Sequence, residues 1–356
     1  MSKKRVLLGM SGGVDSSAAA LVLLRAGYEV AGVTMLLHRQ EADGGCGSLK
    51  EAGDAARVCE TLGIPHEIVD FSEEFSARVK ADFVSEYQRG RTPNPCIVCN
   101  RYLKFGALLD YALERGFDFV ATGHYALVEK RGDRWALLRS PSAKDQSYVL
   151  YRLTQEQLAH TLTPLGTMEK PEARRLAEEA GLPVAHKPDS QDICFIPHGD
   201  YHRFLAEQMG REPEPGNFVS RDGQVLGRHK GITHYTIGQR KGLGLSFGQP
   251  MYVTKIDPAA NEVTLGPEGS QYAPGLLAQD INWVALDNPR EPFRAGVKVR
   301  YSAKPAPAWV IPLEDGGVRV EFDQPQRSVT PGQAAVFYQD DAVAGGGTIS
   351  APLPAE

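Results

Sequence analysis

The chain of 356 residues lacks the features that mark secreted, membrane-bound or strongly charged proteins. Its five cysteines, an odd number, argue against the disulfide framework of a secreted protein. Only a strand-length apolar segment follows the basic residues 3–5, so neither a signal peptide nor a membrane span is expected. A net charge of −5 provides no global basic surface, so a nucleic-acid partner would need local basic patches. These absences predict a cytoplasmic protein.

The first half of the chain alternates short apolar runs with helical patterns. Its length allows two or three domains, and we assign the first to residues 1–198. Repeated strand–helix units predict an α/β fold with a doubly wound parallel sheet, whose ligands lie at the carboxyl ends of the strands. The sequence predicts strands at 29–37, 66–70 and 117–122, and helices at 18–26, 50–62, 72–88 and 102–115.

The second half has weaker helical patterns. We expect a small central β-rich domain at 199–279 and a C-terminal antiparallel β-barrel at 280–356, where alternating runs are split by Pro and Gly. Basic residues and histidines gather at 221–241. This segment is either an RNA-backbone surface or a solvated basic loop.

The most informative segment follows the first apolar run and reads Gly9-Met10-Ser11-Gly12-Gly13-Val14-Asp15-Ser16. Two glycines allow a sharp turn, and a helix starting at Ser16 would offer unpaired N–H groups to a phosphate. No Walker lysine follows. The alternative is a Gly-rich turn with Ser16 as the helix N-cap. The segment resembles the PP-loop of ATP pyrophosphatases, which split ATP between the α and β phosphates.

Three cysteines lie among polar and proline residues. Cys96 and Cys99 form a C-x-x-C pair in a predicted loop at 92–100, and Cys194 follows a polar stretch. Such cysteines can form a disulfide, bind a metal or cluster, or hold an activated thiolate, although buried structural thiols are commoner. Cys59 lies within a predicted helix and favours core packing, whereas the role of Cys46 in a Gly-rich loop stays open.

Several motifs in one order make the resemblance specific. After the PP-loop come Asn94-Pro95 with Cys99-Asn100, then the segments 121–125, 144–148, 191–196, 238–243, 300–301 and 330–334. Together they resemble MnmA, the tRNA-specific 2-thiouridylase family, which places sulfur on the wobble uridine of certain tRNAs. The likeness covers essentially the whole chain, and other PP-loop enzymes share only the first motif.

The resemblance implies roles for individual residues. It assigns ATP to Gly9, Met10, Ser11, Gly12, Gly13, Val14, Asp15, Ser16, Met35 and Gly123. It implies that Cys99 is the nucleophile, that Cys194 carries a persulfide, and that the target base or tRNA meets Asn94, Pro95, Cys96, His124, Lys144, Asp145, Gln146, Arg300, Tyr301 and Gln333. Many family members have Asp where this chain has Cys96, which leaves the role of Cys96 open.

The implied chemistry is adenylation of the uridine C2 oxygen followed by sulfur transfer. Mg²⁺ would neutralise phosphate charge, with Asp15 as its candidate ligand or, equally, a carboxylate that caps the helix. Sulfur would come from a cysteine desulfurase or a sulfur-relay protein. In one scheme Cys194 bears the terminal sulfur and Cys99 releases it. In the other, which the third cysteine favours, Cys96, Cys99 and Cys194 hold a [4Fe-4S] cluster with one open iron. Zinc would not explain sulfur delivery.

Two other functions share some of these features. A different PP-loop enzyme, such as a tRNA lysidine synthetase or an amidotransferase-type synthetase, would not need Cys99 and Cys194. A non-catalytic ATP-dependent tRNA-binding module would release no pyrophosphate. The identity of the tRNAs and the oligomeric state are not encoded in these patterns.

Overall fold

The computed structural model describes residues 3–38, 48–188, 193–196 and 199–354. The chain divides into two compact units, each built from segments far apart in the sequence. Unit 1 comprises Met1–Val79, Pro95–Gly199 and Asp341–Val343, and unit 2 comprises Lys80–Asn94, Asp200–Asp340 and Ala344–Glu356. Among the described residues, no helix combines the length and apolar character needed to cross a membrane.

Unit 1 is built on a five-stranded parallel sheet. The strand order is β3-β2-β1-β4-β7, with bounds Arg5–Gly9 for β1, Glu29–Leu36 for β2, His66–Asp70 for β3, Phe119–Ala121 for β4 and Thr161–Leu162 for β7. The central strand β1 pairs with β2 and β4, so Leu7 lies opposite Ala31 on one side and Val120 on the other. The parallel sheet predicted from the sequence is confirmed.

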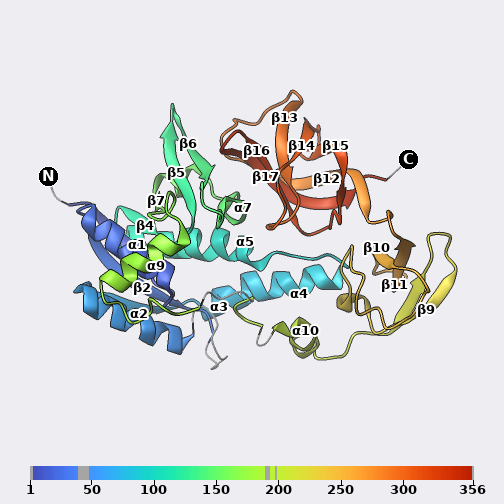
Figure 1. Cartoon of the computed structure of the whole chain (residues 1–356), viewed down its shortest axis with the longest axis horizontal. Helices are drawn as coiled ribbons and strands as arrows, with labels where there is room; N and C mark the ends of the chain where they lie inside the picture. The colour runs from blue at the N-terminus through green and yellow to red at the C-terminus, as the bar shows by residue number, and fades with distance from the viewer. Residues whose placement is uncertain (1–2, 39–47, 189–192, 197–198, 355–356) are drawn as a thin grey trace. The chain divides into compact units, whose positions relative to one another are not determined.

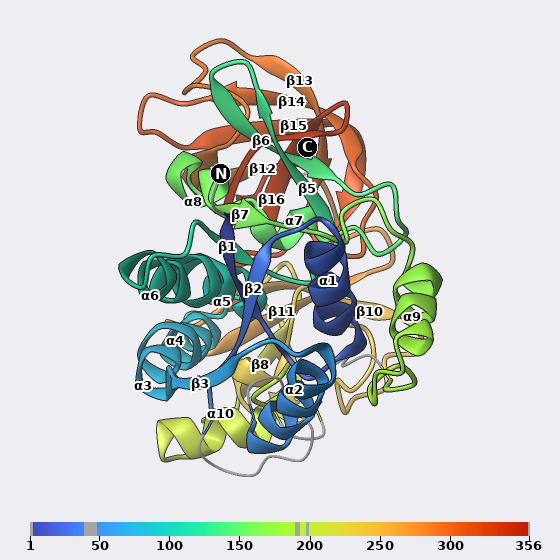
Figure 2. The same ribbon diagram turned by 90° about the vertical axis from the view of Figure 1, so that its left-hand side faces the viewer.

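Helices cover both faces of this sheet (Figure 2). Helices α1 (Val14–Arg25), α2 (Leu49–Leu62) and α9 (Lys170–Glu179) pack their apolar residues with Val6 and Leu8 of β1 in one core. Helix α6 (Leu108–Glu114) lies on the opposite side. Small residues such as Ala19 and Ala173 in this core allow close approach between helices. The fold is therefore doubly wound, as predicted.

The predicted helix at 72–88 is one continuous helical segment. It consists of α3 (Ser72–Phe75), a π-helical turn η1 (Ser76–Lys80) and α4 (Ala81–Gln88). The first segment of unit 1 ends at Val79 within this helical segment, and α4 belongs to unit 2.

The predicted loop at 92–100 is wrong in its second half. Residues Pro95–Cys99 form the short helix α5, which continues into the π-helical segment η2 (Asn100–Ala107) and then α6. Proline is well tolerated in the first turn of a helix because its missing N–H would have no partner there. Prolines that suggested a loop therefore mark a helix start, and both cysteines of the C-x-x-C pair are helical.

Several short elements of unit 1 were not predicted. Residues after β4 form a hairpin of β5 (Ala126–Arg131) and β6 (Arg134–Arg139). Helices α7 (Ser147–Leu150) and α8 (Gln155–Ala159) follow, and a capping box at Thr154 and Gln157 starts α8.

Unit 2 contains a small sheet and a barrel (Figure 1). The small sheet has the order β10-β11-β8-β9, with bounds Met251–Asp257, Glu262–Pro267, Gly216–Val219 and Val225–His229. Six antiparallel strands form the barrel, which β12 closes by pairing with both β15 and β17. Their bounds are Tyr272–Trp283 for β12, Phe293–Lys298 for β13, Ala306–Pro312 for β14, Val318–Arg327 for β15, Ala334–Gln339 for β16 and Ala342–Pro352 for β17. The predicted barrel is confirmed, although its first strand begins before residue 280.

Two further helical elements of unit 2 pack against α4. They are α10 (Tyr201–Met209), which was not predicted, and the 3-10 turn η4 (Ile232–His234). Ring centroids of Phe83 and Phe204 are 6.0 Å apart, and those of Tyr87 and Tyr201 are 5.3 Å apart. This aromatic cluster joins α4 to residues more than a hundred positions later in the chain.

Candidate functional site

The PP-loop turns from β1 into α1 at the carboxyl edge of the sheet. Helix α1 begins at Val14 with Gly13 as its N-cap, so the alternative that Ser16 caps the helix is wrong. The Ser16 hydroxyl instead donates to the Gly13 carbonyl oxygen at 3.2 Å and accepts from the Ser11 N–H at 3.2 Å. These bonds hold the loop in a tight arch with helix N–H groups at its mouth.

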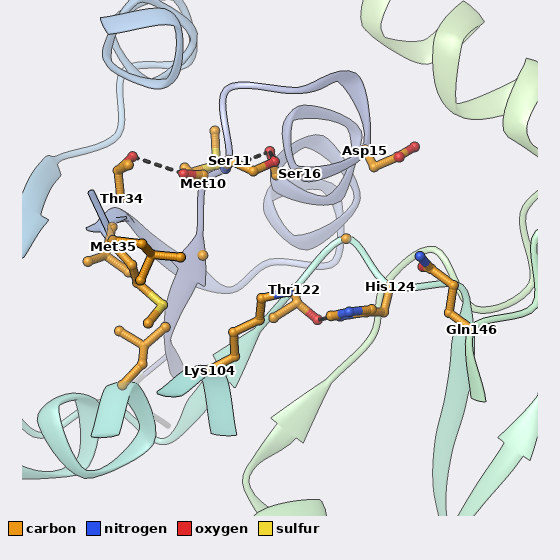
Figure 3. Close-up of a pocket in the computed structure, with 15 residues that line it drawn as sticks. Met10, Ser11, Asp15, Ser16, Thr34, Met35, Lys104, Thr122, His124 and Gln146 are labelled. Atoms are coloured by element: carbon orange, nitrogen blue, oxygen red, sulfur yellow. Dashed lines mark hydrogen bonds between the residues drawn. The ribbon is translucent and has the colours of Figure 1, made fainter. Parts of the chain in front are cut away.

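A cavity of about 200 Å³ opens beside this loop (Figure 3). It brings together seven residues predicted to bind ATP, namely Gly9, Met10, Ser11, Asp15, Ser16, Met35 and Gly123. The predicted residues Gly12, Gly13 and Val14 lie in the turn that leads into α1. Apolar side chains of Val33, Met35, Leu37 and Leu108 line one part of the cavity. Asp15 lies toward the other end in Figure 3, which gives the cavity an apolar and a polar end.

Two glycines of the site are required by close backbone approach. A Cβ atom at Gly123 would come within 2.8 Å of the Asp15 carbonyl carbon and 2.9 Å of the Ser16 nitrogen. Gly12 has φ +65°, and a Cβ there would overlap the carbonyl oxygen of Glu51. Side chains at either position would push the first turn of α1 or the PP-loop out of place.

The Asp15 carboxylate is held by two side chains. The Lys170 ammonium, at the start of α9, donates to both carboxylate oxygens at 2.8 Å, and the Tyr125 hydroxyl donates to Oδ1 at 2.7 Å. A carboxylate at this place suits Mg²⁺, which prefers oxygen ligands. An incoming Mg²⁺ would have to share Asp15 with Lys170 or displace it, so phosphate oxygens would need to supply further ligands.

A second lysine, Lys187, links the PP-loop to carboxylates of α2. Lys187 donates to the Gly12 carbonyl oxygen at 3.0 Å, to Glu51 Oε2 at 2.8 Å and to Asp54 Oδ2 at 2.6 Å. Burial disfavours charge on both Lys187 and Asp54, but their hydrogen bond and mutual attraction prevail, so the pKa of Lys187 is raised and that of Asp54 is lowered. This group of charges ties the PP-loop to α2.

His124 lies in the cavity wall, in the segment that follows β4. Burial, with a smaller effect of the nearby Lys104 charge, holds the pKa of His124 well below its usual value. Its Nδ1 is 2.7 Å from the Thr122 hydroxyl. His124 is therefore a neutral imidazole at pH 7, beside a lysine that also lines the cavity.

The cysteines differ in exposure. Cys99 is buried, Cys96 is exposed, and Cys194 is intermediate, next to Phe195, whose ring centroid is 5.5 Å from that of Phe75. Cys59 is buried in the core as predicted, and burial raises the pKa of its thiol to about 11. Cys46 and residues 189–192 of the motif before Cys194 lie outside the described residues.

In one of the two sulfur-transfer schemes, Cys96, Cys99 and Cys194 hold a [4Fe-4S] cluster. Within the described part of the chain, no group of three or more His, Cys, Asp or Glu side chains is arranged to hold a metal ion. The arrangement thus does not fit a preformed cluster site, and a cluster stays a prediction.

Other residues predicted to meet tRNA have structural partners. Gln146 lines the cavity and accepts from the Tyr125 N–H at 3.0 Å. Asp145 accepts from the N–H groups of Ser140 and Ser147 at 3.0 and 3.1 Å, which closes the turn that carries Lys144. The structure therefore places His124 and Gln146 in the cavity wall.

The remaining predicted tRNA residues belong to unit 2, except Pro95 and Cys96 at the start of α5. Arg300 donates to the Arg327 carbonyl oxygen at 2.9 Å, and Tyr301 is exposed. Gln333 donates to the carbonyl oxygen of Thr92 at 2.8 Å, just before Asn94.

Three lysines of the site were not predicted as functional. Lys104 lines the cavity, while Lys170 and Lys187 contact Asp15 and the PP-loop. The partners of Lys170 and Lys187 lie more than 130 positions away in the sequence, so no local spacing marks them. Only the missing Walker lysine hinted that a cation must come from elsewhere in the chain.

Comparisons with known proteins cover nearly the whole chain. Residues 4–198 match the tRNA methyl transferase HUP domain, residues 202–267 the tRNA methyl transferase PRC-barrel domain, and residues 273–349 the aminomethyltransferase beta-barrel domain. The U34-tRNA thiolase NcsA from Methanococcus maripaludis, solved with its [4Fe-4S] cluster, is 19% identical and covers 58% of this chain and 66% of its own, with a TM-score of 0.35. A TM-score this low assigns neither its fold nor its cluster to this chain.

Curated relatives match along their full length. The tRNA-specific 2-thiouridylase MnmA of Acetivibrio thermocellus is 51% identical over 98% of this chain and 100% of its own length. The MnmA protein of Clostridium perfringens is 50% identical over 99% of this chain and 100% of its own length. From the motifs, the fold and this degree of identity, the chain belongs to the MnmA family of tRNA-specific 2-thiouridylases.

Proposed function

We propose that this chain is a tRNA-specific 2-thiouridylase. It uses ATP to activate the C2 oxygen of the wobble uridine in a tRNA anticodon stem-loop and then replaces that oxygen with sulfur. The observation that carries the proposal is the cavity at the PP-loop, in a chain about half identical to MnmA proteins over nearly its whole length. The products are 2-thiouridine, AMP and pyrophosphate.

The cavity supports the binding of ATP with its phosphates toward Asp15. The apolar side chains of Val33, Met35 and Leu37 suit the adenine ring. Ser11, Ser16 and the first N–H groups of α1 suit the phosphates. Mg²⁺, when bound, would neutralise phosphate charge, with Asp15 as its protein ligand.

Activation replaces a poor leaving group with a good one. The uridine C2 oxygen attacks the α phosphorus of ATP, the bond to the bridging oxygen breaks, and pyrophosphate leaves. Lys104 in the cavity wall can offset the negative charge that develops on the α phosphate. The neutral His124 beside Lys104 adds no second positive charge at this point of the cavity wall.

Sulfur transfer then uses two cysteines. A persulfide on Cys194 attacks C2 with its terminal sulfur, and AMP leaves with the former C2 oxygen. The Cys99 thiolate next attacks Sγ of Cys194, which releases 2-thiouridine and leaves a Cys99–Cys194 disulfide. A cytoplasmic dithiol reductant restores both thiols, and a cysteine desulfurase or a sulfur-relay protein supplies the next persulfide sulfur.

A cluster on Cys96, Cys99 and Cys194 is the alternative source of sulfur. It predicts that anaerobically prepared protein carries about four irons and that Cys96→Ser loses iron and activity together. Full activity of rigorously iron-free protein would exclude it. The persulfide scheme needs no third cysteine, and the exposed Cys96 could then be replaced by Ala with little effect.

The test is a reaction of the full chain with tRNA, ATP and a sulfur source. Mass spectrometry of the digested nucleosides should detect 2-thiouridine, and chromatography should detect AMP with pyrophosphate. Formation of ADP and phosphate would overturn the PP-loop assignment. AMP formation with lysidine or an amidated nucleoside in place of 2-thiouridine would point to another PP-loop enzyme.

A further inference from the structure

The ion pair between Lys170 and Asp15 lies at the polar end of the cavity. Asp15 lines the cavity and is in the first turn of α1, where the unpaired N–H groups of the helix suit a phosphate. The Lys170 side chain is only 11% exposed, and its ammonium is 2.8 Å from each Asp15 carboxylate oxygen. A buried lysine thus ends one carboxylate away from the space that a nucleotide would fill.

The ion pair neutralises a carboxylate at the end of the cavity where the phosphates would bind. A triphosphate carries several negative charges, and an uncompensated carboxylate at the phosphate end would repel it. The PP-loop contains no lysine between Gly9 and Ser17, unlike a Walker loop, in which a lysine reaches the terminal phosphates. Lys170 supplies a cation at this end from a helix 155 positions later in the sequence.

The anchoring of Lys170 keeps it within reach. Lys170 is the first residue of α9, whose alanines Ala173 and Ala177 are fully buried in the core shared with α1. The backbone is therefore fixed, while the flexible side chain can exchange one anionic partner for another nearby. The Tyr125 hydroxyl bond to Asp15 Oδ1 would keep the carboxylate in place if the ammonium left.

We propose that Lys170 is the pyrophosphate-binding cation of this PP-loop: its ammonium neutralises Asp15 in the nucleotide-free cavity and donates to the β and γ phosphates when ATP is bound. The proposal rests on the proposed function, in which ATP is cleaved between its α and β phosphates. Lys170 would then contact the pyrophosphate leaving group, whereas binding of the adenosine part of ATP would not depend on Lys170.

Pyrophosphate and AMP, the two parts into which ATP is cleaved, probe the phosphate end and the adenosine end of the cavity separately. Calorimetric titration of the full chain with inorganic pyrophosphate, without Mg²⁺, should give a Kd at least about tenfold higher for Lys170→Met than for the unmodified protein. The Kd for AMP should change less than about twofold. In the matched control Lys187→Met, which loosens the whole PP-loop from α2, binding of both probes should weaken together. Unchanged pyrophosphate affinity in Lys170→Met would overturn the proposal.

A double variant excludes a purely indirect role. If Lys170 acts only as the counter-ion of Asp15, Lys170→Met should have no effect on pyrophosphate affinity once Asp15 has been replaced by Asn. The double variant should then bind pyrophosphate as tightly as Asp15→Asn alone. We expect instead that Asp15→Asn binds pyrophosphate more tightly than the unmodified protein, because Lys170 no longer has a competing partner, and that adding Lys170→Met removes this gain.

The proposal can be tested even if one variant does not fold, and without the thiolation reaction. If Lys170→Met shows no cooperative unfolding transition and is therefore not folded, the pyrophosphate affinity of Asp15→Asn tests the proposal, since weaker binding in that variant contradicts it. The titrations need neither tRNA nor sulfur. A failure here with normal 2-thiouridine formation would refute the role of Lys170 alone, and the reverse result would refute the proposed function alone.

Discussion

Cys59 and Cys99 are both buried in unit 1, yet the same substitution should affect them differently. Cys59→Ser places a hydroxyl in the apolar core and should lower the free energy of unfolding by about 1 to 3 kcal/mol while thiolation continues. Cys99→Ser and Cys194→Ser should each abolish 2-thiouridine formation with little change in thermal stability. Mass spectrometry of tRNA nucleosides and thermal unfolding of the three variants measure both effects.

Each of the roles proposed for Cys99 and Cys194 can be contradicted on its own. Full thiolation by Cys194→Ser with sulfide as the source would exclude a persulfide on that residue. Loss of thiolation in Cys59→Ser without any loss of stability would mean that the core cysteine takes part in chemistry.

His124 should make the protein sensitive to mild acid. Because burial lowers the pKa of His124, the unfolded chain binds more protons than the native one below the ordinary value of 6.5. Stability is therefore full above pH 6.5 and falls as the pH drops from 6.5 toward the lower native pKa. Thermal unfolding at pH 7.5 and 5.5 should show a larger loss for the unmodified protein than for His124→Asn, which does not titrate. An identical loss in both would show that His124 is not the cause.

At the scale of single elements, Gly12 and Gly27 offer a matched pair. Both have positive φ, +65° and +86°, but a Cβ at Gly12 would overlap the Glu51 carbonyl, whereas nothing lies within 4 Å at Gly27. Gly27→Ala should cost only the backbone strain of about 1 kcal/mol. Gly12→Ala should cost several times more and lower ATP affinity, because the PP-loop must move away from α2. Thermal unfolding and ATP titration compare the two, and equal losses would show that the clash has no consequence.

Local signals in the sequence predict elements well where one residue marks a boundary. The helix predicted at 50–62 ends where expected, because Gly63, directly after it, is the left-handed C-cap of α2. The strand at 66–70 has the predicted bounds. Helix α5 was missed because Pro93 and Pro95 indicate a loop and a helix start equally well. The hairpin of β5 and β6 was also missed, since neither strand has a long apolar run.

Some residues of the candidate site could likewise be predicted from the sequence, and others could not. Residues on the PP-loop and at strand ends, such as Met35 and Gly123, could be placed from motif order and from the rule that ligands bind at carboxyl ends. Lys170 could not, because its pairing with Asp15 depends on how α9 packs against α1. Tertiary packing brings this cation to the loop, and the residues around Lys170 carry no phosphate-binding pattern.

For the molecule as a whole, both units are discontinuous in sequence. The division into 1–198, 199–279 and 280–356 expected from the sequence stays a proposal, since α4 lies within the first range but belongs to the same unit as the later strands. The assignment of α4 to unit 2 predicts that residues 1–198 alone lack part of the packing that covers α4.

A fragment ending at residue 199 should therefore expose apolar surface. It would keep α4 but lose Tyr201 and Phe204, which contact Tyr87 and Phe83. Each aromatic side chain left uncovered adds roughly 150 to 250 Å² of apolar surface. Binding of the dye ANS and light scattering should both be higher for this fragment than for one ending at Gly210, which retains α10. Equal dye binding by the two fragments would contradict the assignment of α4 to unit 2.

The same discontinuity has a consequence during synthesis on the ribosome. Phe83 leaves the ribosome about 120 residues before Phe204, its partner in the aromatic cluster. At ordinary rates of translation this delay is roughly 6 to 24 seconds, far longer than a helix needs to form. During that time the apolar face of α4 has no native cover. The nascent chain is thus expected to need a holding chaperone at this stage, before any of the barrel has been translated.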